Sequence, residues 1–169
     1  IGVALPGENL TRKEAQARAA LLKVHSYEIA LDLTQGDTTF ASTTTVKFAA
    51  NQAGASTFID AITAKVHSIT LNGKALDVAS VNDGVRIQLD DLAAENELVV
   101  VADANYMNTG EGLHRFVDPV DNEVYLYSQF EVPDSRRVFA VLEQPSLKAT
   151  FQFTVTAPEA WKVISNQAT

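Results

Sequence analysis

Alternation of apolar and polar residues runs through most of the chain from residue 26 onward. Tyr27, Ile29 and Leu31 alternate with polar or small neighbours, as in a strand that buries one face. Similar short segments follow, and we expect them to be strands: 43–48, 58–62, 66–71, 85–89, 98–101, 124–127, 150–156 and 161–164. Asn72-Gly73 and Asp83-Gly84 provide the residues of tight hairpin turns. Many short strands with turn signals about every 8–12 residues predict an all-β sandwich.

Two segments depart from this period. Thr11 and Glu14 have the spacing of a capping box, and the Ala-rich sequence after them predicts a short N-terminal helix that reaches Leu22. Its apolar stripe, which we expect to dock on the protein's own core, has heptad-like spacing and comprises Leu10, Ala17, Leu21 and Val24. The stretch 105–122 is polar with interspersed glycines, so we expect a long structured loop there.

Composition narrows the possible classes of protein. The 169 residues fit one domain and include no cysteine, which excludes disulfide scaffolds, cysteine nucleophiles and iron–sulfur sites. Thirteen Lys and Arg against 21 Asp and Glu give a net charge of −8, so we expect no nucleic-acid partner. No apolar run approaches the roughly 20 residues of a membrane span. Together with the lack of a visible secretion signal, this predicts a cytoplasmic protein.

No local motif in the chain forms a complete catalytic site. The three histidines, His25, His67 and His114, lie in no metal-binding spacing, and we expect them at the surface or in loops. We expect the acidic residues near the strand at 98–101 to be solvated turn carboxylates; they are Asp90, Asp91, Glu95 and Glu97.

The most informative polar positions are Gln129 and Glu131. In an extended chain they point to the same side, with Phe130 opposite, and could bind a ligand that has hydrogen-bond donors. The pattern alone favours an ordinary polar outer face of a sheet.

A series of motifs, in order, resembles the N-terminal domain of the aminopeptidase N-like zinc metallopeptidases from Asn9 to Asn166. The segments that carry the resemblance are Tyr27-Glu28-Ile29-Ala30-Leu31-Asp32-Leu33, Thr57-Phe58-Ile59-Asp60, Ile69-Thr70-Leu71-Asn72-Gly73, Gly112-Leu113-His114-Arg115-Phe116, Ser128-Gln129-Phe130-Glu131, Arg136-Arg137, Lys148-Ala149-Thr150-Phe151 and Ile164-Ser165-Asn166. The chain departs from the family where Glu143-Gln144 replaces an acidic pair before Pro145. That change weakens any charged contact from this turn to a neighbouring domain.

The resemblance implies a saddle-shaped, multi-stranded β-sandwich with a short N-terminal helix, which closes one side of an active site. It implies that Glu131 binds the free α-ammonium group of a peptide substrate and that Gln129 lines the pocket for the first side chain. Arg136 and Arg137 are expected in a surface salt bridge or a domain interface. The resemblance further implies a cis peptide bond between Glu131 and Val132.

The expected organisation is a single β-domain over residues 10–169, preceded at 1–9 by a native leader or a cloning remnant. The zinc ligands would belong to a downstream catalytic domain, so this chain alone is expected to bind no zinc and to be inactive. Two alternatives stay open. One is a non-catalytic scaffold or binding domain from a relative without the zinc motif. The other is a carbohydrate- or protein-binding module, for which Tyr125 and Tyr127 are the aromatic candidates.

Overall fold

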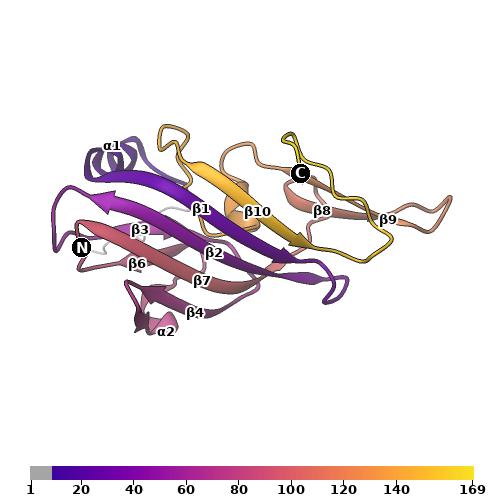
Figure 1. The fold of residues 1–169 in the computed structure, drawn as a ribbon, viewed down its shortest axis with the longest axis horizontal. Helices are drawn as coiled ribbons and strands as arrows, with labels where there is room; N and C mark the ends of the chain where they lie inside the picture. The colour runs from indigo at the N-terminus through magenta and orange to yellow at the C-terminus, as the bar shows by residue number, and fades with distance from the viewer. Residues whose placement is uncertain (1–8) are drawn as a thin grey trace, which may run out of the picture.

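A twisted six-stranded sheet forms the larger layer of the molecule (Figure 1). The computed structural model describes residues 9–169; residues 1–8, and with them most of the expected leader, lie outside the described residues. The elements are α1 (Arg12–Leu21), β1 (Leu22–Asp32), β2 (Thr39–Ala50), β3 (Thr57–Asp60), β4 (Lys65–Leu71), β5 (Lys74–Leu76), α2 (Val78–Val81), β6 (Arg86–Leu89), β7 (Glu95–Asn105), β8 (Gly112–Val117), β9 (Val124–Gln129), the 3-10 turn η1 (Ser135–Arg137) and β10 (Thr150–Thr156).

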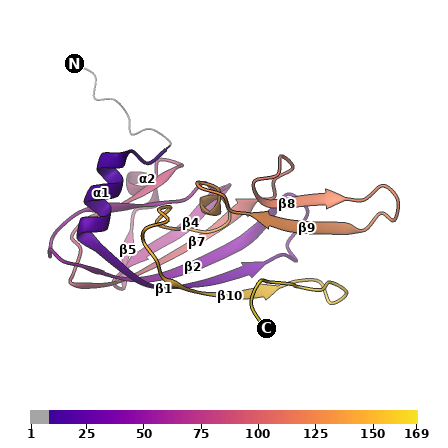
Figure 2. The ribbon, with the colours of Figure 1, turned by 90° about the horizontal axis from the view of Figure 1, so that it is seen from above.

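The large sheet has the strand order β10-β1-β2-β7-β4-β5. Its neighbours are antiparallel except for β1 and β10, which run parallel. Strands β3 and β6 form a second small sheet, and β8 and β9 form a hairpin. The hairpin extends beyond the end of the large sheet, opposite the end that carries α1, as both views show (Figures 1 and 2). The prediction of an all-β, multi-stranded fold with a short N-terminal helix is confirmed.

The core lies on one face of the large sheet because every second residue of its central strands points inward. Tyr27 and Ile29 of β1, Val46 of β2 and Leu98 of β7 are at most 2% exposed. The residues between them remain half-buried or exposed. The two-residue period read from the sequence therefore marks the buried face correctly.

Helix α1 begins as predicted, and its expected apolar stripe docks in part: Leu21 packs against the core and Val24 is 6% exposed. Thr11 and Glu14 form a complete capping box, and the helix ends at Leu21. Ala17, part of the expected apolar stripe, is exposed, whereas Arg18 is 2% exposed. Arg18 was not predicted at the docking face because its buried partners lie in distant segments, and a hydrophobic pattern does not reveal such partners.

Two other segments differ from their predictions. The expected loop 105–122 contains strand β8, which is stabilised by pairing with β9 along its whole length. The segment 161–164 was expected to be a strand but has no regular structure, and no strand of the described part of the chain pairs with it. Strand formation depends on a partner as well as on local preference. Within residues 9–169, none of the helices is both long and apolar enough for a membrane span.

Candidate functional site

The candidate site lies where the β8–β9 hairpin returns to the body of the molecule. Gln129 is the last residue of β9 and pairs with Gly112, the first residue of β8. From there the chain turns at Glu131 and enters η1. We call residues 129–134 the Gln129–Asp134 turn.

Two hydrogen bonds fix the backbone of this turn. The Glu131 N–H donates to Oε1 of Gln129 at 3.0 Å. The Asp134 N–H donates to the Glu131 carbonyl oxygen at 2.9 Å. The structure thus brings Gln129 and Glu131 together. The contact joins the side chain of Gln129 to the backbone of Glu131, and Glu131 lies beyond the end of β9.

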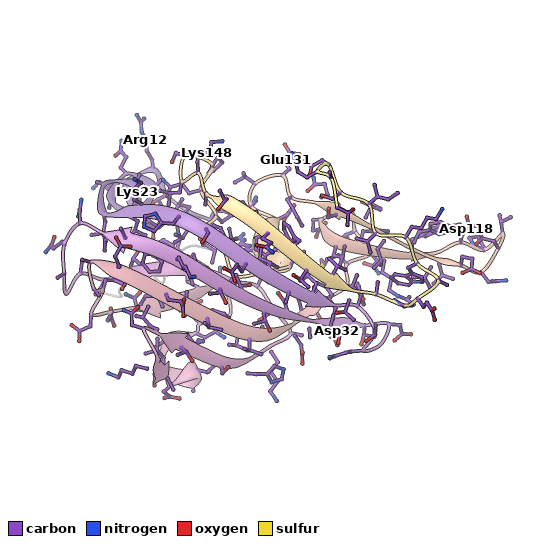
Figure 3. The ribbon with its side chains drawn as sticks, in the orientation of Figure 1. Arg12, Lys23, Asp32, Asp118, Glu131 and Lys148 are labelled. Carbon is purple, nitrogen blue, oxygen red and sulfur yellow. The ribbon has the colours of Figure 1, made fainter. Side chains whose placement is uncertain are left out.

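The carboxylate of Glu131 is exposed at the molecular surface (Figure 3). Within the described residues it has no hydrogen-bond or ion-pair partner. The Glu131 backbone is held by hydrogen bonds at its N–H and its C=O, while its carboxylate is exposed and unpaired. This carboxylate is therefore available to a cationic ligand.

Phe130 anchors the turn on its inner side. Its ring meets the buried Phe139 edge-on, with ring centroids 5.6 Å apart. The interpretation that Phe130 points away from Glu131 is consistent with these positions, since Phe130 packs against the core and Glu131 is exposed.

The expected cis bond was placed one residue too early. In the described residues the cis peptide bond is Val132–Pro133, and the Glu131–Val132 bond is not cis. Proline forms a tertiary amide, whose preference for trans is much weaker than that of other residues. The prediction was therefore wrong for this sequence.

Glu143 forms hydrogen bonds with the residues that directly follow the turn. Its Oε2 accepts hydrogen bonds from the hydroxyl of Ser135 and, at 2.9 Å, from the N–H of Arg136. Both are residues of η1, which directly follows the turn. Burial raises the pKa of Glu143, opposed by the hydrogen bonds from Ser135 and Arg136.

A buried ion pair continues this network toward α1. Oδ2 of Asp60, on β3, accepts from the Glu143 N–H at 3.1 Å and from Nη1 of Arg18 at 2.9 Å. Both side chains of the ion pair are at most 2% exposed. Nε of Arg18 also donates to Oε1 of Gln144 at 3.1 Å. The network links α1, β3 and the segment that leads into β10.

These contacts correct the expectation that Arg136 lies at the surface. Arg136 is 2% exposed and so is no surface residue, whereas Arg137 forms a local ion pair with Asp134 at 3.1 Å. Glu143, at the turn where the sequence weakened the case for a charged contact to a neighbouring domain, is buried and binds within this domain. The sequence contained one signal of this burial. Glu143 directly follows the apolar residues Val141 and Leu142.

The histidines lie apart from the turn's carboxylate. His25 pairs with Glu95 at 3.1 Å and His67 with Asp103 at 2.7 Å, each at an exposed position. His114 lies on β8 and stacks on Tyr127, and its Nδ1 accepts from the Gly110 N–H. Among residues 9–169 no group of three or more His, Asp or Glu side chains is arranged to hold a metal ion.

A shallow groove of about 560 Å³ opens beside β8, away from the candidate turn. Its lining residues are Leu33, Thr34, Gly36, Asp37, Arg115, Pro158 and Trp161. Neither Gln129 nor Glu131 lines it, so it is separate from the candidate site.

Comparison with known sequences finds a family match and close relatives. The model of the family described as "Peptidase M1 N-terminal domain" matches residues 23–169. Aminopeptidase N from Streptomyces lividans is 61% identical over 168 residues, covering 98% of this chain and 20% of the relative. Aminopeptidase N from Acetobacter pasteurianus is 49% identical over 41 residues, covering 24% of this chain and 12% of the relative. The chain thus spans about a fifth of the length of the Streptomyces relative.

Solved structures share the fold at low sequence identity. An M1 zinc metallopeptidase mutant from Deinococcus radiodurans gives a TM-score of 0.63 at 18% identity, covering 80% of this chain and 32% of that one. Legionella pneumophila aminopeptidase A, solved with aspartic acid, gives 0.65 at 15% identity, with 79% and 16% covered. Yeast LTA4 hydrolase gives 0.66 at 15% identity, with 81% and 23% covered.

Proposed function

The chain belongs to the peptidase M1 N-terminal domain family, and from this premise we propose that it is the N-terminal domain of a zinc-dependent aminopeptidase. In this proposal residues 10–169 form one β-domain that binds the free N-terminus of a peptide. A downstream catalytic domain of the same protein cleaves the first peptide bond. The 61% identity to a much longer aminopeptidase N supports both parts of the proposal.

The observation that carries the proposal is the unpaired, exposed carboxylate of Glu131 on the Gln129–Asp134 turn. A peptide α-amino group has a pKa of about 7.7–8.0, so much of it is cationic at neutral pH. A hydrogen bond between this ammonium and a fixed carboxylate contributes roughly 1.5–3 kcal/mol. An anchor at a set distance from the reacting centre selects the first peptide bond, which gives exopeptidase specificity.

Gln129 would line the pocket for the first side chain of the same substrate. Its Oε1 accepts from the Glu131 N–H, which leaves the amide NH₂ as the group that faces a ligand. The same bond ties the position of Gln129 to that of Glu131.

The residues that the structure describes include no cluster of three or more side chains arranged to hold a metal ion. His25 and His67 each pair with one carboxylate on the surface, and no third ligand joins either pair. We therefore place the metal, its ligands and the general base in the downstream domain, and we expect residues 1–169 alone to show no peptidase activity.

The test is Glu131→Gln in the complete enzyme. This variant keeps the size of the side chain and removes its charge, so we expect kcat/KM for peptides with a free N-terminus to fall by about tenfold or more. Cleavage of the same peptides with an acetylated N-terminus should change little, because they lack the ammonium. Steady-state kinetics on the two substrate series measure the difference.

The matched control is Glu123→Gln, which removes one carboxylate from an exposed position immediately before β9. It should leave kcat/KM unchanged. An unchanged kcat/KM in Glu131→Gln would remove Glu131 from the site. A complete sequence without a downstream H-E-x-x-H motif would instead identify the domain as a non-catalytic scaffold.

A further inference from the structure

The shallow groove beside β8 has three walls, which come from distant parts of the chain. The turn between β1 and β2 forms the first wall, Arg115 of β8 forms the second, and Pro158 and Trp161, which follow β10, form the third. The volume of about 560 Å³ lies in the range of about 300–1,000 Å³ that small-molecule sites occupy. All three walls belong to the described residues, so this part of the chain forms the groove by itself.

Hydrogen bonds fix the turn between β1 and β2. Oδ1 of Asp32, which is labelled in Figure 3, accepts from the N–H of Thr34 at 3.0 Å and from its hydroxyl at 2.6 Å. Oδ2 accepts from the side-chain amide of Gln35 at 2.9 Å. The Leu33 N–H donates to the Thr156 carbonyl oxygen at 2.8 Å, which ties the turn to β10. The first wall is therefore ordered, and the carboxylate of Asp32 is already occupied within it.

Arg115 brings an unpaired cation to the groove. Its side chain is half-buried and has no hydrogen-bond or ion-pair partner within the described residues. Burial raises the pKa of Tyr106, and the nearby charge of Arg115 opposes this rise. The buried hydroxyl of Tyr106 nevertheless has no hydrogen-bond partner in the described chain. The guanidinium group of Arg115 is therefore free to bind an anion.

Asp37 brings an unpaired anion to the same groove. Its carboxylate is exposed and has no hydrogen-bond or ion-pair partner among residues 9–169, so no ion pair joins it to Arg115. Leu33, Pro158 and Trp161 are half-buried and add apolar surface. The Trp161 N–H donates to the Pro158 carbonyl oxygen at 2.9 Å, which fixes the third wall. The groove thus offers a cation, an anion and apolar surface to one ligand.

We propose that the groove binds a free amino acid with an apolar side chain, its carboxylate on Arg115, its ammonium on Asp37 and its side chain against Trp161. A guanidinium group forms two parallel, charge-assisted hydrogen bonds with a carboxylate. The indole ring provides a large apolar contact for the side chain. A ligand with a single charge would leave one of the two charged walls unpaired. The connection with catalysis rests on the proposed function, in which free amino acids are the products.

Strand alternation separates this groove from the candidate site. Gln129 pairs with Gly112, and Leu126 pairs with Arg115. Because residues three apart on a strand point to opposite faces, Arg115 and Gln129 lie on opposite faces of the hairpin. An amino acid in the groove therefore leaves the place of a peptide at Glu131 open.

The test is isothermal titration calorimetry on the complete protein in its Glu131→Gln form, in which the candidate turn has lost its charge. We expect saturable binding of L-phenylalanine. Phenylalaninamide lacks the carboxylate and N-acetyl-phenylalanine lacks the ammonium, so we expect each to bind about tenfold or more weakly. No binding of L-phenylalanine, or equal binding of the three compounds, would overturn the proposal.

The matched variants are Arg115→Gln and Arg12→Gln, which remove the same charge from the groove and from an exposed position on α1. Arg115→Gln should raise the Kd for L-phenylalanine by about tenfold or more, while Arg12→Gln should leave it unchanged. Binding that persists in Arg115→Gln would place the ligand elsewhere on the protein and overturn the proposal.

A second variant tests the ammonium partner. Asp37→Asn should weaken the binding of L-phenylalanine but not that of N-acetyl-phenylalanine, which has no ammonium group. An equal effect on both compounds would remove Asp37 from the site. The titrations are read without turnover, so their outcome is distinguishable from the kinetic outcome for Glu131→Gln.

Discussion

At the scale of single residues, Gly112 determines how closely the hairpin approaches the candidate turn. It has a φ of +67°, and a Cβ placed on it would lie 3.1 Å from Cβ of Arg137. Both the backbone conformation and the space therefore favour glycine. Since Gly112 pairs with Gln129, this close approach sets the position from which Gln129 meets Glu131.

We predict that Gly112→Ala lowers the free energy of unfolding by about 1–3 kcal/mol, because alanine is strained at positive φ and its methyl group crowds Arg137. Gly54→Ala is the control: it has a φ of +77° but nothing within 4 Å of the added Cβ. Urea unfolding of both variants separates strain from crowding. Equal losses would show that contact with Arg137 contributes nothing.

Gln129 and Glu131 are site candidates because a resemblance singled them out, while the polar pattern alone favoured an ordinary surface. Sequence reasoning did not identify Arg18, Asp60 and Glu143 as a buried network. A charged side chain is stable in the interior only when distant segments provide partners for it. Arg18 and Asp60 are 42 residues apart, and no local pattern encodes such a contact.

At the scale of elements, helix α1 is fixed at its first turn by one carboxylate with two roles. Glu14 accepts from the backbone N–H of Thr11 at 2.8 Å, which closes the capping box. It also binds Nη1 of Arg86, on β6, at 2.6 Å. The hydrogen bond from Arg86 is the main cause that lowers the pKa of Glu14 to about 2, against an opposing effect of burial.

This lowered pKa predicts a pH dependence of stability. The ordinary pKa of a glutamate carboxyl group is 4.5, so the unfolded chain takes up the proton first as the pH falls. The stabilisation from Glu14 is therefore complete above about pH 5 and is lost between about pH 5 and pH 2. In Glu14→Gln we expect a lower free energy of unfolding at neutral pH and a shallower decline over that range.

Urea unfolding at a series of pH values measures both profiles. Glu123→Gln removes one exposed carboxylate far along the chain and should retain the wild-type slope. A slope in Glu14→Gln as steep as in the wild type would refute the assignment.

Strand positions were easier to predict than strand partners. The two-residue period located β1 and β10, because alternate burial follows directly from strand geometry. It failed for 112–117, where Gly112, His114 and Arg115 obscure the alternation and pairing with β9 decides the structure. It failed in the opposite sense for 161–164, which is apolar enough for a strand but has no partner in the described chain.

At the scale of the whole molecule, the buried pair of Arg18 and Asp60 joins the helix to the second layer. Asp60 also binds the Glu143 N–H, and Glu143 holds the residues that follow the candidate turn. Thus α1, at one end of the molecule, and the Gln129–Asp134 turn are parts of one hydrogen-bonded network.

We predict that Arg18→Met lowers the free energy of unfolding by about 3–5 kcal/mol, because it leaves the Asp60 carboxylate buried without its cation. The double variant Arg18→Met with Asp60→Leu should recover part of this loss, since it removes both buried charges. Chemical denaturation of the wild type, Arg18→Met, Asp60→Leu and the double variant measures the coupling. A double variant with the full sum of the two single losses would indicate that the pair is not coupled.

The junction between α1 and β1 has a consequence for how this domain can vary. The helix ends at Leu21 and the strand begins at Leu22, without a connecting residue. One inserted residue before Tyr27 would put helix and strand out of phase, since the strand face alternates with every residue. The irregularity at His25, between Val24 and Ser26, is where the pairing of β1 with β2 already shifts. Homologues that tolerate a length change in this stretch should therefore carry it at that bulge and keep the spacing from Arg18 to Leu22 constant.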